Sequence, residues 1–367
     1  MSCDFMALAN EGVRQLTPYQ PGKPIEELER ELGLSDVVKL ASNESPIGPS
    51  PDAIAVARDA LGDLARYPDG NGFALKAALA GRLDVEPRQL TLGNGSNDVL
   101  EFVARVFASA GHEVVFSEHA FAVYPLATLA VGATPVSVAA AAYAHDLDAM
   151  AAAITPRTRV VFVANPNNPT GTWIDATSLR AFLHKVPDDV IVVVDEAYCD
   201  YIRRNDYPDC VPWIEHHPNL VVTRTFSKAY GLAALRVGYA VSHPEVADLM
   251  NRVRQPFNVN SVALAAATAA LADEQHLRMA REVNDEGLAY LETAFRQRSL
   301  GFIPSVANFI TVHLPRPAGE VHDSLLRSGV IVRPVGGYGL PEHLRISVGT
   351  AAENERFVAA LDDALSA

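Results

Sequence analysis

The chain has 367 residues, of which 49% are apolar and 20% are charged, and its formal net charge is -14. This composition is typical of a globular protein with a large core, and the length favours a main domain with a smaller one. The negative charge argues against nucleic acid or an anionic membrane as a partner, because both bind basic surfaces. We therefore expect a protein that acts on small molecules.

The first ten residues lack a basic segment followed by an apolar one, so we expect no secretory signal and a cytoplasmic location. The three cysteines, Cys3, Cys199 and Cys210, are too few and too scattered for a disulfide framework or a zinc site. We therefore expect no metal.

The first forty residues are rich in turn formers and predict an arm, which contains a short helix over residues 24–32 and a strand over 37–41. A loop at 43–49 precedes a helix over 51–64, and a second loop covers 66–72. Tyr67 lies directly before a proline in that second loop, so its backbone is expected to be extended.

From Phe73 onward, predicted helices and strands alternate. Helices are expected over 73–83, 99–108, 124–131, 147–153 and 176–185, and strands over 89–92, 113–116, 134–138, 159–163, 190–194, 219–222 and 237–241. Alternation of this kind predicts an α/β fold, with a mostly parallel seven-stranded sheet flanked by helices. The alanine-rich residues 139–144 are expected to form a linker.

The pattern changes near Asn260 and predicts a smaller α+β domain. Helices are expected over 262–271, 274–298, 320–327 and 351–365, and strands over 308–314, 330–334 and 344–348. We divide the chain into an N-terminal arm that joins part of the small domain (1–43), a large domain (44–260) and a small C-terminal domain (261–367).

Two neighbouring predicted strands end in groups that carry chemistry. Asp195 ends one buried strand, and Lys228 follows the next, so both are expected at the carboxyl edge of the sheet. An amine beside a carboxylate suits a Schiff base with pyridoxal phosphate, whose pyridinium nitrogen requires an acid. For Lys228 taken alone, a solvated lysine after a strand is the alternative.

Other segments could complete such a site. The turn from Gly93 to Asn97 precedes a helix and could hold a phosphate with its amides, together with Arg236, Thr225 and Ser227. The loop 165–171 could direct an amide at the cofactor, and Phe121 could lie on its ring. Taken singly, each segment has an ordinary alternative. The turn could be a common strand-to-helix turn, Arg236 a surface arginine, the loop 165–171 a rigid turn and Phe121 a core residue.

The joint pattern is more specific. It comprises Asn94-Gly95-Ser96, the loop 165–171, Asp195-Glu196-Ala197-Tyr198, Ser227-Lys228 and Arg236. In this order the segments resemble the fold type I pyridoxal-phosphate aminotransferases. Segments 18–24, 39–44, 66–70 and 255–260 are similar to the histidinol-phosphate aminotransferase family within that group. The resemblance extends from about Thr17 to Leu365.

The resemblance implies a role for each matched residue. Lys228 would form the internal aldimine with pyridoxal 5'-phosphate and move the proton, and Asp195 would keep the pyridinium protonated. Tyr198 and Asn168 would bind the phenolic oxygen, and Phe121 would stack on the ring. The phosphate would be held by Gly95, Ser96, Asn97, Thr225, Ser227 and Arg236.

The resemblance also implies a shared site in a homodimer, because Tyr67 would reach the phosphate of the neighbouring subunit's cofactor. Arg345 and Arg333 would bind anionic groups of the substrate, and Tyr19 would close over it. Without the resemblance, either arginine would be taken for a surface ion-pair partner.

The expected reaction interconverts L-histidinol phosphate and 2-oxoglutarate with imidazole-acetol phosphate and L-glutamate, through a pyridoxamine phosphate form, in histidine biosynthesis. An aromatic amino acid aminotransferase and threonine-phosphate decarboxylase, a lyase, are the alternatives within the fold. A cofactor-binding regulator is the alternative from another class, but the chain has no basic stretch or spare length for a DNA-binding module.

Overall fold

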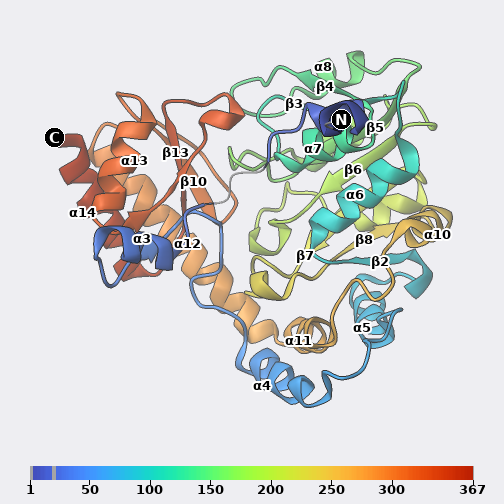
Figure 1. Cartoon of the computed structure of the whole chain (residues 1–367), viewed down its shortest axis with the longest axis horizontal. Helices are drawn as coiled ribbons and strands as arrows, with labels where there is room; N and C mark the ends of the chain where they lie inside the picture. Colours follow the sequence, from blue (N-terminus) through green and yellow to red (C-terminus); the bar gives the residue numbers. More distant parts are fainter. Residues whose placement is uncertain (1–2, 19–21, 367) are drawn as a thin grey trace.

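The structure is a computed structural model that describes residues 3–18 and 22–366. Its largest element is a seven-stranded sheet with strand order β2-β8-β7-β6-β5-β3-β4 (Figure 1). The strands are β2 (Leu90–Gly93), β3 (Glu113–Ser117), β4 (Thr134–Val138), β5 (Thr158–Ala164), β6 (Ile191–Asp195), β7 (Leu220–Thr225) and β8 (Gly238–Ser242). Strand β8 runs antiparallel to β2 and β7, and the other neighbouring strands pair in parallel. The predicted mostly parallel sheet is thus confirmed.

Helices cover both faces of this sheet because its central strands are apolar on both sides. In β6, Ile191 and Val193 pack with one core cluster, and Val192 and Val194 with another. The first face is covered by α6 (Ser96–Phe107), α7 (Val123–Ala130) and α10 (Pro244–Val253); the second by α5 (Phe73–Leu83), α8 (Leu147–Ala152), α9 (Ala176–Leu183) and α11 (Ser261–Ala272). Continuous Val and Ile runs are typical of such doubly covered strands.

The C-terminal part of the chain forms a second sheet, with order β12-β13-β10-β9. Its antiparallel strands are β9 (Phe302–Ile303), β10 (Phe309–His313), β12 (Arg333–Pro334) and β13 (His343–Ser347). It packs with α12 (Glu274–Gln297), α13 (Ala318–Arg327) and α14 (Ala351–Ser366) around a separate apolar cluster. Figure 1 shows α12 running from the helices of the large sheet to the smaller one.

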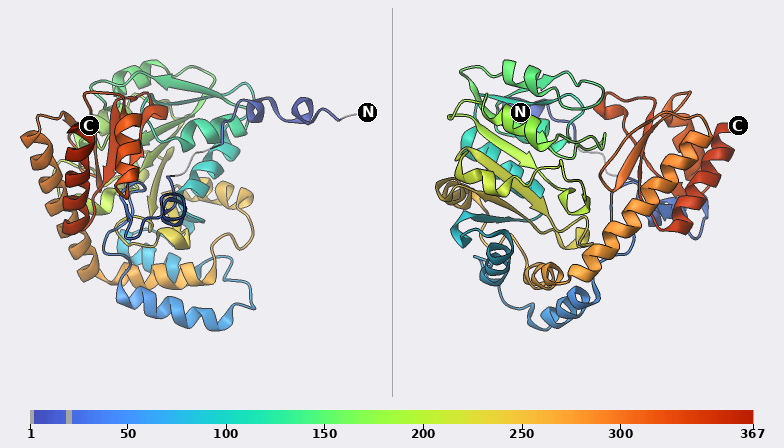
Figure 2. Two further views of the ribbon diagram at one scale, coloured as in Figure 1. Left: turned by 60° about the vertical axis from the view of Figure 1, so that its left-hand side comes forward. Right: turned by 180° about the vertical axis from the view of Figure 1, so that it is seen from behind.

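The N-terminal segment joins both parts. Its helices are α1 (Phe5–Leu8), α2 (Glu11–Arg14), α3 (Ile25–Leu32) and α4 (Pro51–Ala60), the last continued by η1 (Leu61–Asp63), and β1 (Val38–Lys39) pairs in parallel with β11 (Val330–Ile331). The N-terminal end projects from the body of the molecule (Figure 2). However, Gly12 is buried against α7, where a Cβ would lie 1.9 Å from the Leu129 carbonyl oxygen. Part of the expected arm is therefore packed.

Several short elements were not predicted. Helices α1 and α2 have four residues each, and β9 has two, too few to show a period. The longer omission is α10, which begins with Pro244 in its first turn and buries Val246, Ala247 and Met250. Proline at a helix start and this spacing were the available signals. The predicted linker 139–144 contains an isolated bridge between Ala141 and Ala144. Within the described part of the chain, no helix has the length and apolar character to cross a bilayer.

Candidate active site

A cavity with a volume of about 890 Å³, including its open mouth, lies where β5, β6 and β7 end and α6 begins. Its walls also include residues of the smaller sheet and the segment that follows β1. The sequence-predicted residues that line it are Ser96, Asn97, Phe121, Asn168, Asp195, Tyr198, Thr225, Ser227, Lys228, Arg236, Arg333 and Arg345. The fold thus gathers around one cavity residues that range from Gly22 to Arg345 in the sequence.

Lys228 lies in the turn after β7, and its side chain enters this cavity. Its Nζ donates to the carbonyl oxygens of Ser42 at 3.0 Å and Asn43 at 3.2 Å. Burial, assisted by the positive charge of Arg345, lowers the pKa of Lys228 to about 7. Since burial disfavours the charged form, a neutral amine is available near neutral pH.

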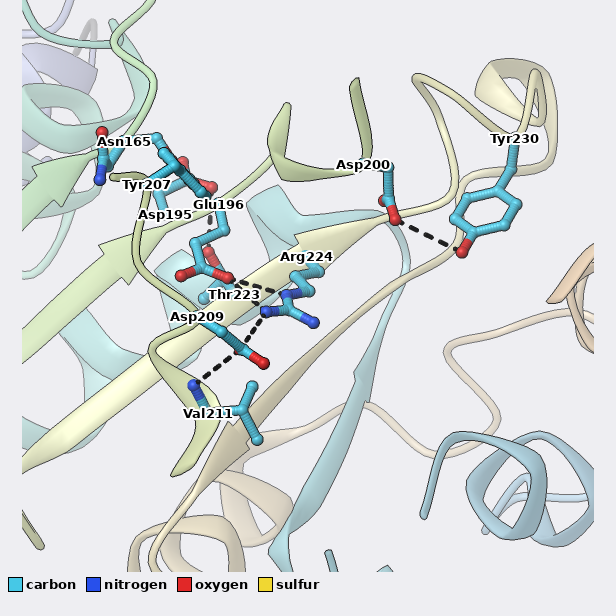
Figure 3. Close-up of polar contacts among 10 residues, drawn as sticks. All are labelled: Asn165, Asp195, Glu196, Asp200, Tyr207, Asp209, Val211, Thr223, Arg224 and Tyr230. Atoms are coloured by element: carbon cyan, nitrogen blue, oxygen red, sulfur yellow. Dashed lines mark hydrogen bonds and ion pairs between the residues drawn. The ribbon is translucent and has the colours of Figure 1, made fainter. Parts of the chain in front are cut away.

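Asp195 ends β6 and is buried among hydroxyl groups. Its carboxylate accepts hydrogen bonds from the Tyr124 hydroxyl at 2.9 Å and from Thr223 Oγ1 at 3.0 Å (Figure 3 shows Asp195 and Thr223 on their neighbouring strands). Burial raises the pKa of Asp195, and this effect outweighs the hydrogen bonds from Tyr124 and Thr223, which lower it. A buried carboxylate of this kind is stabilised by a cationic partner, such as a protonated ring nitrogen.

The start of α6 forms an anion cradle. Its N-cap residue, Gly95, has φ 85° and makes no side-chain capping bond, so the first backbone N–H groups are left for a ligand. A Cβ on Gly95 would lie 2.4 Å from Arg236 Nη2, and one on Gly238 would lie 2.4 Å from the Ser96 nitrogen. These two glycines therefore let the turn approach the guanidinium and β8 closely.

Hydroxyl groups complete the cradle. Ser227 Oγ accepts from Arg236 Nη1 at 3.4 Å, and the Ser227 backbone nitrogen donates to Thr225 Oγ1 at 3.1 Å. Backbone amides, hydroxyls and a guanidinium around one space suit a phosphate group.

The opposite wall joins Tyr198 to the smaller sheet. Asn43 Nδ2 donates to the Tyr198 hydroxyl oxygen at 3.0 Å, and burial raises the pKa of Tyr198 to about 12. Arg345, on β13, donates from Nη1 to Asn168 Oδ1 at 2.6 Å and from Nη2 to the Ala41 carbonyl oxygen at 2.6 Å. One guanidinium thus connects both sheets at the cavity.

Of the predicted site residues that the structure describes, Gly95 and Tyr67 do not line this cavity. Gly95 lies beneath the cradle as the N-cap of α6. Tyr67 is 82% exposed and stacks on Phe257, with ring centroids 4.7 Å apart. Tyr19 lies outside the described residues.

Sequence reasoning missed two groups that contact the site. Tyr124 was assigned only to a helix, although its hydroxyl reaches Asp195. The segment 41–43 was interpreted as a strand end and a turn, yet its carbonyls bind Arg345 and Lys228. Asn43 has φ 54°, and Ser347 Oγ accepts from its backbone nitrogen at 2.7 Å. The available signals were its polar side chain in a turn-rich loop and its place in the segment 39–44, which resembles the family.

The residues present fit pyridoxal phosphate. One cavity contains the Lys228 amine, whose pKa is lowered to about 7, and the buried Asp195 carboxylate, whose pKa is raised. It also contains the start of α6, which has no side-chain cap and lies beside Arg236. These three features match the aldehyde, the ring nitrogen and the phosphate of that cofactor. Phe121 adds an aromatic wall.

Comparison with known proteins supports pyridoxal phosphate as the cofactor. The family described as aminotransferase class I and II matches residues 35–361. Histidinol-phosphate aminotransferase 2 of Pseudomonas fluorescens (strain Pf0-1) is 59% identical over 368 residues, covering 100% of both chains. Histidinol-phosphate aminotransferase 2 of Pseudomonas aeruginosa is also 59% identical, over 99% of both chains.

Solved structures show the same fold. The crystal structure of histidinol-phosphate aminotransferase from Sinorhizobium meliloti in complex with pyridoxal-5'-phosphate has a TM-score of 0.90 and 31% identity, covering 98% of this chain and 97% of that one. A Thermus thermophilus aspartate aminotransferase mutant shares the fold, with a TM-score of 0.85, 23% identity and coverage of 98% and 99%. The chain therefore belongs to the class I and II aminotransferase family, and over its full length it is similar to the histidinol-phosphate aminotransferases of that family.

Proposed function

We propose that this protein is a pyridoxal-phosphate-dependent aminotransferase that interconverts L-histidinol phosphate and 2-oxoglutarate with imidazole-acetol phosphate and L-glutamate. The observation that carries the proposal is the cavity in which Lys228, Asp195 and two arginines of the smaller sheet converge. The names of the relatives at 59% identity favour this reaction over the aromatic aminotransferase and the decarboxylase. The reaction belongs to histidine biosynthesis, and we propose a cytoplasmic location for it.

The cofactor, when bound, supplies an electron-withdrawing ring that stabilises negative charge on the substrate Cα. Asp195 would hold the proton on the ring nitrogen, because its buried carboxylate gains from a cationic neighbour. Asn168 and Tyr198 would bind the phenolic oxygen, and Phe121 would pack on the ring. The phosphate would bind the amides of Ser96 and Asn97, the hydroxyls of Thr225 and Ser227, and Arg236.

Lys228 would serve as the general base and acid. Burial lowers the pKa of its amine to about 7, so the amine would take a proton from the substrate Cα and return one near neutral pH. The carbonyls of Ser42 and Asn43 orient the amine by accepting its hydrogen bonds. Arg345 and Arg333 would bind the carboxylate of glutamate or the phosphate ester of histidinol phosphate.

Single-turnover absorbance tests the reaction. Holoprotein is mixed separately with histidinol phosphate, phenylalanine and threonine phosphate, and loss of the bound cofactor's visible absorbance is followed. Fast loss with histidinol phosphate alone is expected. Equal rates with phenylalanine would identify a broad aromatic aminotransferase, whereas carbon dioxide release from threonine phosphate would identify the lyase.

We also propose that the protein is a homodimer with shared active sites. Tyr67 is supporting evidence, because it is 82% exposed and lies away from the cavity of its own chain. Mixing inactive Tyr67→Ala and Lys228→Ala subunits should restore about a quarter of wild-type activity, since half of the random dimers would have one intact site. A monomeric mass in light scattering, or no restoration after subunit exchange, would contradict the shared site.

We propose a division into a large domain (44–260), a small domain (261–367) and an arm (1–43), with the first helix after the boundary, α11, packed against the large sheet. The hydrophobic cluster of the smaller sheet supports it, because this cluster includes Val38 and Leu40 from the end of the arm together with residues of α12, α13 and α14. Limited proteolysis with mass spectrometry of the fragments would test the boundary near residue 260.

A further inference from the structure

The last contacts between β6 and β7 use both faces of the sheet. On the cavity face, Asp195 accepts from Thr223 Oγ1. On the opposite face, Glu196, directly after β6, pairs with Arg224, the next residue of β7 (Figure 3). A backbone hydrogen bond of 2.8 Å from the Glu196 nitrogen to the Thr223 carbonyl oxygen lies between the two pairs. Successive strand residues point to opposite faces, so the two pairs alternate.

The pair is buried and held from more than one side. Glu196 Oε2 accepts from Arg224 Nε at 2.8 Å and lies 2.7 Å from Nη2, and the same Nη2 donates to Asp209 Oδ1 at 2.9 Å. The Glu196 side chain is 0% exposed and that of Arg224 is 13% exposed, whereas Asp209 is 66% exposed. Asp209 Oδ1 also accepts from the Val211 nitrogen, which ties the following loop to the pair.

The same loop reaches a third strand. The Tyr207 hydroxyl donates to the Asn165 carbonyl oxygen at 2.6 Å, directly after β5 (Figure 3 labels both residues). The loop therefore contacts the ends of β5, β6 and β7 beneath the cavity. The loop after β5 contributes Asn168 to the cavity, β6 contributes Asp195, and the turn after β7 contributes Lys228.

We propose that Glu196 and Arg224 are positioning residues for the aminotransferase reaction: their buried pair fixes the last contact between β6 and β7 and so sets the Asp195 carboxylate relative to the Lys228 amine. The proposal rests on the proposed function for its kinetic part. Desolvating a buried ion pair costs free energy, which is recovered only in geometries that keep its hydrogen bonds. Such a pair therefore contributes more to the alignment of β6 and β7 than to the free energy of folding. Lys228 lies four residues beyond Arg224, and in the intervening turn the Phe226 nitrogen donates to the carbonyl oxygen of Val237, the residue before β8.

The test uses two single variants, Glu196→Gln and Arg224→Met, and the double variant Glu196→Met/Arg224→Met. Each single variant leaves one buried partner without its counterpart and should lower the melting temperature. The double variant replaces the pair by apolar side chains of similar volume and should regain much of that loss. Glu113→Gln is the matched control, because Glu113 is a buried glutamate paired with Arg157 at the opposite edge of the same sheet.

Three readouts separate alignment from stability. They are the melting temperature, the pH at which the visible absorbance of bound pyridoxal phosphate changes, and kcat against KM with histidinol phosphate. We expect the double variant to keep a lowered kcat, by about tenfold to hundredfold with KM little changed, because small misplacements of reacting groups have effects of this size. Its absorbance transition should stay shifted by about half a pH unit or more. Glu113→Gln should change only the melting temperature.

A double variant with wild-type kcat and absorbance transition would overturn the proposal. Glu196 and Arg224 would then only neutralise each other's buried charge. Single variants that behave as Glu113→Gln does would overturn it as well. If the double variant stays unstable, its kcat and absorbance transition are compared with those of Glu113→Gln, each at the same distance below its own melting temperature. A lower kcat and a shifted transition in the double variant alone support the proposal, and equal values overturn it. The absorbance transition requires only bound cofactor, so it tests the alignment even if wild-type protein fails to convert histidinol phosphate.

Discussion

The two edges of the seven-stranded sheet use similar side chains in different surroundings. At the carboxyl edge, Glu196 is fully buried and burial raises its pKa, with Arg224 acting against this. At the amino edge, the Thr155 hydroxyl and Arg157 lower the pKa of Glu113, and Arg157 is 70% exposed. Water reaches the amino-edge pair through its arginine, whereas the carboxyl-edge pair is covered by the loop 202–210.

The contrast extends to the neighbouring groups. Lys228 and Asp195, also at the carboxyl edge, have pKa values displaced by burial toward their neutral forms. Shifts of this kind permit proton transfer near neutral pH, and structural ion pairs at an open edge do not need them. Desolvation, more than the choice of residue types, therefore separates the reactive edge from the structural one.

The largest loss of activity is expected when the Lys228 amine is removed from the carboxyl edge. Lys228→Ala should lower kcat with histidinol phosphate and 2-oxoglutarate by about 10⁴-fold, since proton transfer by a positioned group contributes up to that factor. Steady-state kinetics measures this. Lys185→Ala, which removes an exposed lysine paired with Asp148, is the control and should retain activity. A Lys228→Ala variant within tenfold of wild type would exclude the assigned role.

Neutralising the carboxylate should have the next largest effect. In Asp195→Asn one oxygen remains to accept from Tyr124 or Thr223, and the other becomes an NH2 group that can donate to the second hydroxyl oxygen. The negative charge that we propose faces the ring nitrogen is lost. We expect kcat to fall by about 10²- to 10³-fold, as for other removed electrostatic contacts. The pH-rate profile should change as well. An unchanged profile would argue that Asp195 does not face the cofactor.

The pKa of Lys228 predicts a pH dependence of stability in the cofactor-free protein. The folded value is about 7 and the ordinary value is 10.5, so the unfolded state binds more protons between these pH values, and stability should rise with pH across that window. The gain relative to Lys228→Met should reach up to about 5 kcal/mol. Urea unfolding at several pH values measures it, and parallel curves for the two proteins would refute it.

The smallest effect is expected at the amino edge. Arg157→Ala should cost at most about 1 kcal/mol at pH 7, because Arg157 is 70% exposed and solvent screens its attraction to Glu113. The folded pKa of Glu113 is lowered, so the stability it contributes is present above its ordinary pKa and is lost as pH falls through the folded value. The difference between wild type and Arg157→Ala should therefore shrink below about pH 4. Lowered kcat in Arg157→Ala would contradict the separation of the two edges.

Much of this edge could be predicted from local patterns. The apolar runs of β6 and β7 are followed by Asp195 and by Lys228, and parallel strands bring their ends together. The glycine-bearing turn before α6 likewise predicted an anion site. In contrast, Arg333 and Arg345 were assigned only through resemblance, because nothing local distinguishes a cavity arginine from a surface one.

For other contacts, no local signal identified the partner. Tyr124 reaches Asp195 across 71 positions, and Asn43 contacts Ser347 across 304. Helix α10 was not predicted, although its sequence has a proline in the first turn and apolar residues at helical spacing. Contacts between distant segments depend on how helices and sheets pack, and a period within one segment carries no information about its partner.

The sequence by itself therefore determined the alternation of strands and helices, the parallel sheet, and the acid and the amine at its carboxyl edge, because these follow from hydrophobic period and strand direction. The tertiary structure alone decided which groups are buried there. It covered Glu196 and Arg224 with a loop, brought Arg345 from the smaller sheet, and placed the carbonyls of Ser42 and Asn43 on Lys228. The physical reason is that desolvation depends on everything packed around a group, whereas the charge of a side chain depends first on its type.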